Sequence, residues 1–300
     1  MAAANPPTET KSFREIASMA SNRAMKGGLT GAAAQVVNVL GLMGLRTTMN
    51  YQMAKGGTMV GTMKLLYKEG GVPRFYRGLV PALVQSPIAR FGDTFANAGV
   101  LTALDASPRF CNMPLALKTA VASVSAGGMR ICLMPIDAWK TNKQVHGEGG
   151  LQSLMKKVQT YPNRGPANLY GWTSLWHGGL AAASATAVGH WPWFVTYNYL
   201  DLYLPWNHGT AMQKVLRNAF IGIAASFVSD VSSNGIRVLK TYRQTYPEPI
   251  GYWVAFSKIR AEYGLFGWQG FFFRGLQTRI VSHGINSMVF TVAWKYFQQM

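Results

Sequence analysis

The chain has 300 residues, and only 13% of them are charged, about half the usual share. Together with an uncharged stretch from 165 to 200, this excludes an ordinary soluble protein as the expected class. The net charge of +18 attracts phosphate, and no nucleic-acid motif accompanies it, so we expect anionic lipids or anionic solutes as partners and no nucleic acid.

Catalytic chemistry is not indicated. The two cysteines, Cys111 and Cys132, form neither a disulfide framework nor a metal-binding spacing, and the five histidines are scattered. No set of nucleophile and base, and no phosphate-binding loop, is present. We therefore expect no enzyme activity, no metal site and no organic cofactor.

Residues 1–21 predict a polar tail, and three similar units follow it, at 22–106, 107–209 and 210–300. In each unit a Gly, Ala and Ser-rich helix ends at a glutamine, and a glycine and a short amphipathic helix come next. An aromatic residue, a basic residue or His, and a glycine then form a triplet before a second long apolar helix. The glutamines are Gln52, Gln144 and Gln244, the short helices cover 58–68, 151–158 and 252–263, and the triplets end at Gly78, Gly178 and Gly275.

The middle unit contains the most specific motif. Pro135 removes a backbone donor and predicts a bend in its helix. Asp137 and Lys140 are three residues apart and therefore share a helical face, and Gln144 lies one turn further on.

This order resembles the mitochondrial carrier family, the solute carriers of the inner membrane. Pro135, Asp137, Lys140 and Gln144 match that family's Pro-x-Asp/Glu-x-x-Lys/Arg motif and its following Gln, and Glu69-Gly70 with Phe75-Tyr76-Arg77-Gly78 matches its second motif. The similarity covers about residues 22–298. It implies an all-α membrane protein with six transmembrane helices in three two-helix repeats, short matrix-side amphipathic helices and a pseudo-threefold bundle around a central cavity. An even number of spans puts both termini on one side, which the resemblance makes the intermembrane space.

The resemblance also implies a matrix-side gate, in which an Asp of one odd-numbered helix pairs with a Lys of the next. Here only the Asp137–Lys240 contact is expected, because Met43, Leu45 and Thr48 occupy the motif positions of the first unit and Gly235, Arg237 and Lys240 those of the third. Lys140 and Arg237 are expected to face Leu45 and Thr48 without a counter-charge. The cytoplasm-side charge motif is absent, whereas the glutamines that brace the family's gate, Gln52, Gln144 and Gln244, are all present.

Substrate contacts in the family follow the triplet glycine by seven or eight residues. The matching positions here include Gln85, Thr186, Ser282 and His283. Asn38, Arg130 and Asp230 lie five residues before each motif Pro or its equivalent, and charges inside a membrane span usually face a cavity or each other. Arg130 and Asp230 are therefore expected either to bind a zwitterion such as an amino acid or to pair with each other.

Cardiolipin phosphates bind in the family between the N-termini of the short helices and the triplets. The matching residues are Gly57, Arg77, Gly78, Gly150, Gly178, Gly251, Arg274 and Gly275. The alternative is that these glycines only form turns. The net charge and the free N–H groups of helix N-termini favour the lipid interpretation.

Two functions remain open at this point. The first is a carrier that moves a small polar metabolite across the mitochondrial inner membrane by alternating access. The second is a carrier-fold protein that no longer transports and serves as a structural subunit of a large respiratory or other inner-membrane complex, which would account for the missing gate charges.

Overall fold

The computed structural model describes residues 13–160, 169–204 and 211–286, which form helices and turns without a β-strand, so the all-helical class is confirmed. Most of the predicted tail (1–21) and both chain termini lie outside the described residues. The helices are α1 (Phe13–Lys55), α2 (Met59–Phe75), α3 (Leu79–Ala106), α4 (Leu115–Cys132), α5 (Met134–His146), α6 (Gly150–Thr160), α7 (Leu169–Trp172), α8 (Gly179–Tyr203), α9 (Ala211–Thr245) and α10 (Tyr252–Tyr263), and a further helical segment covers 276–286.

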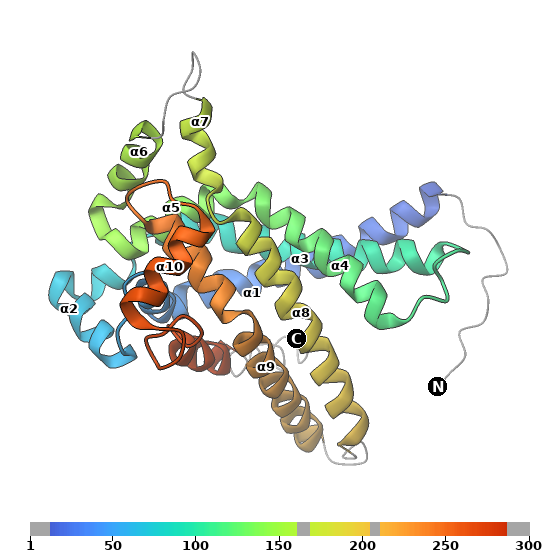
Figure 1. Ribbon diagram of the computed structural model, residues 1–300. Coiled ribbons are helices and arrows are strands. Elements are labelled where there is room, and N and C mark those ends of the chain that lie inside the picture. Colours follow the sequence, from blue (N-terminus) through green and yellow to red (C-terminus); the bar gives the residue numbers. More distant parts are fainter. Residues whose placement is uncertain (1–12, 161–168, 205–210, 287–300) are drawn as a thin grey trace.

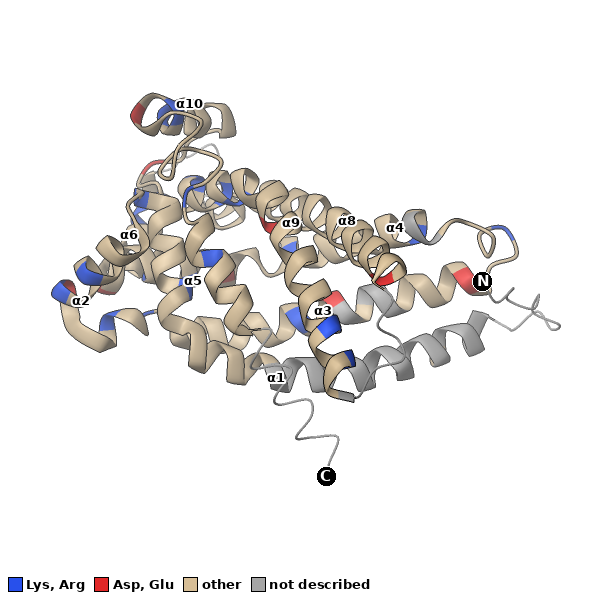
Figure 2. Ribbon diagram, turned by 90° about the horizontal axis from the view of Figure 1, so that it is seen from below, with Lys and Arg blue, Asp and Glu red and all other residues tan. Residues whose placement is uncertain are grey.

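The long helices pack side by side in chain order. α1 contacts α3, α3 contacts α4, α4 contacts α8, and α8 contacts α9, which in turn contacts α1 (Figure 1). The short helices α2, α6 and α10 lie toward one end of these long helices, and α2 and α6 carry Lys and Arg there (Figure 2). An apolar cluster at this end joins α1, α9 and α10 through Met53, Val238 and Ile259.

The short helices begin close to their predicted starts because the local sequence supplies the turns. Gly56 and Gly57 have φ of 80° and 101°, values that favour glycine, and the Thr58 side chain accepts a hydrogen bond from the Gly61 N–H as the N-cap of α2. α2 runs past its predicted end at residue 68. Its helical geometry breaks at Gly70 and Gly71, just after that position.

The bend predicted at Pro135 is present. The segments Leu117–Cys132 and Met134–Thr160 are bent by 68°, with Leu133 at the break. Pro135 lies in the first turn of α5, where a missing N–H leaves no helical hydrogen bond unmade. The bend therefore ends α4 and starts α5 in a new direction, with Asp137 in its first turn.

Each triplet glycine packs on the backbone of another segment's helix. A methyl group added at Gly78 would lie 3.0 Å from the Lys140 carbonyl oxygen, and one at Gly178 would lie 3.2 Å from that of Lys240. The same addition at Gly275 would lie 3.3 Å from the Met49 carbonyl oxygen. All three glycines have positive φ, so both space and torsion angle require glycine.

The outward faces of the long helices are apolar. Val80, Val84 and Ile88 are exposed at four-residue spacing on α3, and a similar exposed stripe on α9 consists of Leu216, Phe220, Ile223 and Phe227. Large exposed apolar areas indicate contact with a membrane or another protein.

Few of these helices meet a simple criterion for membrane spans. Among the described residues one helix, Met212–Thr245 of α9, is long and apolar enough to cross a membrane, and the bent pair Leu117–Cys132 with Met134–Thr160 is a second if it counts as one span. By length and composition alone this is weak support. Charged residues on the cavity side, such as Arg46 on α1 and Arg90 and Asp93 on α3, lower the mean hydropathy of the others.

Candidate functional site

A cavity of about 420 Å³ lies between α1, α3, α4, α5, α8, α9 and the segment 276–286. Its lining is mostly polar and strongly basic. The charged residues that line it are Arg46, Arg90, Arg130, Lys140, Arg237, Lys240 and Arg279, with Asp93 and Asp137 as the acidic ones. Such a volume suits a small molecule.

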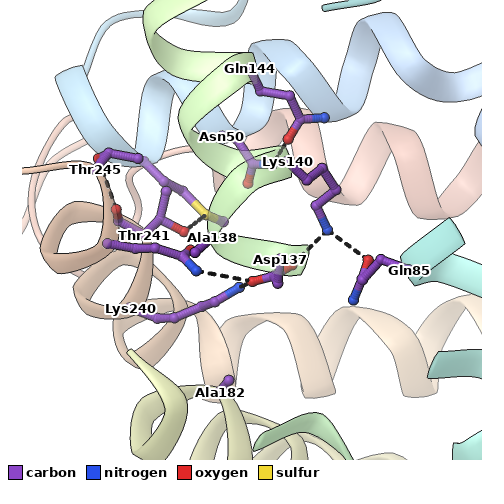
Figure 3. Close-up of polar contacts among 12 residues, drawn as sticks. Asn50, Gln85, Asp137, Ala138, Lys140, Gln144, Ala182, Lys240, Thr241 and Thr245 are labelled. Carbon is purple, nitrogen blue, oxygen red and sulfur yellow. Dashed lines mark hydrogen bonds and ion pairs between the residues drawn. The ribbon is translucent and has the colours of Figure 1, made fainter. Parts of the chain in front are cut away.

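Asp137 is the centre of the charge contacts at one end of this cavity. Its carboxylate accepts from Lys140 Nζ at 2.7 Å and from Lys240 Nζ of α9, and its side chain is 8% exposed. The two lysines approach it from different sides, and Lys140 also donates to Gln85 Oε1 at 2.9 Å (Figure 3). The predicted Asp137–Lys240 contact is confirmed in geometry. The expectation that Lys140 has no counter-charge is wrong, because one carboxylate serves both ammonium groups.

The three glutamines lie beside these contacts and connect helices. Gln144 Oε1 accepts from Asn50 Nδ2 of α1 at 2.5 Å, and Gln244 Nε2 lies 3.4 Å from Asp137 Oδ2. Gln52 Oε1 accepts from Thr278 Oγ1 at 2.5 Å. All three side chains are buried, so each ties its own helix to another element.

Arg237 also lines the cavity, but its contact differs from the predicted one. Its Nε donates to Ser233 Oγ at 3.3 Å, within α9. The Thr48 hydroxyl, its expected neighbour, donates to the Gly44 carbonyl within α1. The prediction that Arg237 lacks a carboxylate partner holds for the described residues.

Arg130 and Asp230 do not pair with each other. Arg130 Nη2 donates to Asp93 Oδ2 of α3 at 2.5 Å. Asp230 lies 2.8 Å from Arg279 Nη2 and 2.6 Å from His283 Nδ1, both on the segment 276–286. The expected mutual pair is therefore wrong. Arg130 lines the main cavity and Asp230 does not, so the two charges do not face a common space in this structure.

The remaining predicted substrate contacts divide between two spaces and the packed interior. Gln85, Arg130, Ser282 and His283 line the main cavity, and Thr186 lines an adjoining space of about 30 Å³. Asn38 and Asp230 line neither space. Asn38 of α1 is buried. Asp230 pairs with Arg279, and its side chain is 2% exposed.

Two arginines of the cavity were missed by the sequence reasoning, Arg46 on α1 and Arg279 on the segment 276–286. Neither belongs to a repeated motif. Arg46 lies between the motif-aligned positions Leu45 and Thr48, and Arg279 follows its triplet glycine by four residues. A signal that could have found them is their charge within otherwise apolar helices.

The predicted lipid residues have varied surroundings. Gly57, Gly78, Gly178 and Gly275 have positive φ, and a methyl group at Gly150 would lie 2.5 Å from the Asn142 carbonyl oxygen. Turn geometry and close packing therefore suffice to explain them. Arg77 is partly exposed and pairs with Glu148 at 2.5 Å, whereas Arg274 is buried and stacks 4.4 Å from the Tyr263 ring. Gly251 is exposed at the start of α10.

Buried basic side chains cap the C-terminal ends of α5 and α9 near the short helices. Arg74 donates to the carbonyl oxygens of Gln144 and Val145 at the end of α5. Lys157 Nζ donates to that of Arg243 at 2.8 Å near the end of α9. Burial, and then the charge of Arg243, lower the pKa of Lys157 to about 7. Burial followed by the charges of Arg243 and Lys157 lowers the pKa of His177 to about 3, so this histidine is neutral at physiological pH.

These features define a basic cavity in whose lining Asp137, Lys140 and Lys240 form ion pairs. The chain matches no protein family profile and no curated protein sequence.

Proposed function

We propose that this chain is a divergent solute carrier of the mitochondrial inner membrane, which moves a small polar metabolite by alternating access. The observation that carries the proposal is a charged cavity enclosed by helices whose outer faces are apolar. In a soluble protein the charges face water and the apolar faces meet inside. The reverse arrangement suits a bundle whose surroundings are lipid and whose interior admits a polar solute.

The contacts around Asp137 act as the gate in this proposal. They join α5 and α9 at the cavity end nearest α6. A carrier must break such contacts to release its solute on that side and re-form them to open the other side, and their strength sets the population of each state. The geometry matches a state closed at this end.

The proposed layout has six spans in three repeats. The spans are α1, α3, the bent pair of α4 and α5, α8, α9 and the helix that begins at residue 276. The contacts of Gly78, Gly178 and Gly275 support it, because each joins one repeat to the odd-numbered helix of another. The short helices α2, α6 and α10 then face the matrix, and both termini face the intermembrane space. The basic residues of α2 and α6 are suited to bind cardiolipin or other anionic lipid.

The test of transport is uptake of radiolabelled solutes, including amino acids and carboxylates, by liposomes containing the purified protein. Arg130→Ala should abolish uptake, because it removes a cavity cation. Arg109→Ala, an exposed change of the same kind between α3 and α4, should leave uptake unchanged. Since Arg130→Ala also strands Asp93, the double variant Asp93→Asn with Arg130→Gln is measured beside it. Full uptake in both Arg130 variants would remove this residue from the site.

A second function is favoured by the sparse gate charges. Asp137 is the only carboxylate among the gate residues, and Arg237 has no carboxylate partner in the described part of the chain. A carrier-fold protein that serves as a structural subunit of a respiratory assembly would tolerate both features. Native-gel migration of gently solubilised mitochondrial membranes distinguishes the two. Stoichiometric migration with a large complex supports the subunit function, and migration alone supports the carrier.

A further inference from the structure

The cavity contains more positive charge than its own carboxylates neutralise. Seven Lys or Arg side chains line it, against two Asp. The ion pairs assign Asp137 to Lys140 and Lys240, Asp93 to Arg130, and the neighbouring Asp230 to Arg279 and His283. Every nearby carboxylate is therefore already occupied.

Two arginines remain in the cavity without a carboxylate within 4 Å among the described residues, Arg46 and Arg237. Arg237 has one neutral acceptor, Ser233 Oγ, and both side chains are only partly exposed. In addition, Nη1 of Arg279 is buried without an acceptor in the described part of the protein. Partly buried guanidinium groups without a counter-charge and with few hydrogen-bond acceptors are costly, unless a ligand supplies the negative charge and the acceptors.

We propose that the cavity binds a small molecule that carries two negative charges, as a dicarboxylate or a phosphate, and that Arg46 of α1 and Arg237 of α9 bind it. This inference rests on the proposed carrier function and narrows its substrate class. Guanidinium groups match both anions because each presents paired N–H donors to two oxygens. A zwitterion fits less well, since its ammonium group needs a carboxylate and each of the three near the cavity already holds a cation.

The binding test is thermal unfolding of the detergent-purified full-length protein at constant pH and ionic strength. The probes are succinate, inorganic phosphate, acetate as a single-charge control and glutamine as a zwitterion. The variants are Arg46→Gln and Arg237→Gln, with Arg260→Gln on the exposed face of α10 as the matched control. A ligand that binds only the folded protein raises its melting temperature, so titration of the shift gives an apparent affinity.

We expect succinate or phosphate to raise the melting temperature of the unmodified protein and of Arg260→Gln, and acetate and glutamine to have little effect. Each cavity variant should bind the effective dianion roughly 10- to 100-fold more weakly, because one set of charge-assisted hydrogen bonds is lost. Its unliganded melting temperature should stay the same or rise, since an unpaired charge has been removed. The stronger of the two probes identifies a dicarboxylate or a phosphate compound.

Three results overturn the inference. They are stabilisation by glutamine and not by either dianion, an equal effect of succinate in the unmodified protein and both cavity variants, and no stabilisation by any probe. The carrier proposal is tested separately. Uptake of a neutral or zwitterionic solute by the liposomes would support transport and would refute the inference that the cavity binds a dianion. A lower unliganded melting temperature in both variants would show that the arginines are structural and would also count against the inference.

Discussion

Asp137→Asn tests whether one carboxylate holds the closed end of the cavity together. The Asp137 carboxylate contacts Lys140 at 2.7 Å, Lys240, and Gln244 at 3.4 Å, with only 8% of its side chain exposed. A charge pair at 4 Å is worth about 4 kcal/mol at an effective dielectric of 20, before the cost of dehydration is subtracted. Removing one partner of a buried pair costs about 3–5 kcal/mol. Lys140 would keep Gln85 as an acceptor, so Lys240 would lose more.

The assay is thermal unfolding of the purified protein, and the expected decrease in melting temperature is roughly 10 °C. Glu148→Gln is the matched control, because it makes the same chemical change in a pair whose carboxylate side chain is 86% exposed. That exposed pair should contribute no more than about 1 kcal/mol. Adding Lys240→Met to Asp137→Asn should recover part of the loss. Equal melting temperatures for Asp137→Asn and Glu148→Gln would refute the reasoning.

Two further predictions concern the end of the protein at which the short helices α2, α6 and α10 lie. With the folded-state pKa of Lys157 lowered to about 7, its buried charge destabilises the protein below that pH, and the penalty disappears as the pH rises toward the unfolded value. The stability of the unmodified protein relative to Lys157→Met should therefore increase by about 2 kcal/mol between about pH 6.5 and 8.5, as measured by denaturant unfolding, while the exposed change Lys156→Met should show no such trend. Gly178→Ala should destabilise by about 1–3 kcal/mol more than Gly267→Ala, since both have positive φ but only the first methyl group would meet the backbone of Lys240. Equal melting temperatures of the two alanine variants would contradict this packing argument.

The spacing of residues along the chain predicted the structural features that depend on local geometry. The bend at Pro135 and the short helices follow from motifs whose residues share a helical face or a turn, whereas the contact of Asp137 with Lys240 was expected only from the resemblance to the carrier family. The partners of Asp230 could not be obtained this way. The partners are Arg279 and His283, which lie on the segment 276–286. Packing, and not a sequence motif, sets the rotation of this segment about its own axis.

The same limit explains the errors about Asn38 and Arg46. Counting five residues back from the proline position assumes that α1 presents the same face to the cavity as α4, yet α4 is broken before Pro135 and α1 is continuous. Gln35, Leu42 and Arg46 of α1 line the cavity, and Asn38, which lies on nearly the same helical face, is buried and does not line it.

The close contact of Gly78 with α5 and of Gly178 with α9 determines which parts must move together. Gly78 packs directly on the backbone of Lys140, and Gly178 packs on the backbone and the Cγ of Lys240. A shift that draws Lys240 away from Asp137 therefore pushes or pulls the start of α8 with it, as a shift of Lys140 does for α3. The parts that move together in such a displacement are therefore α5 with the start of α3, and α9 with the start of α8.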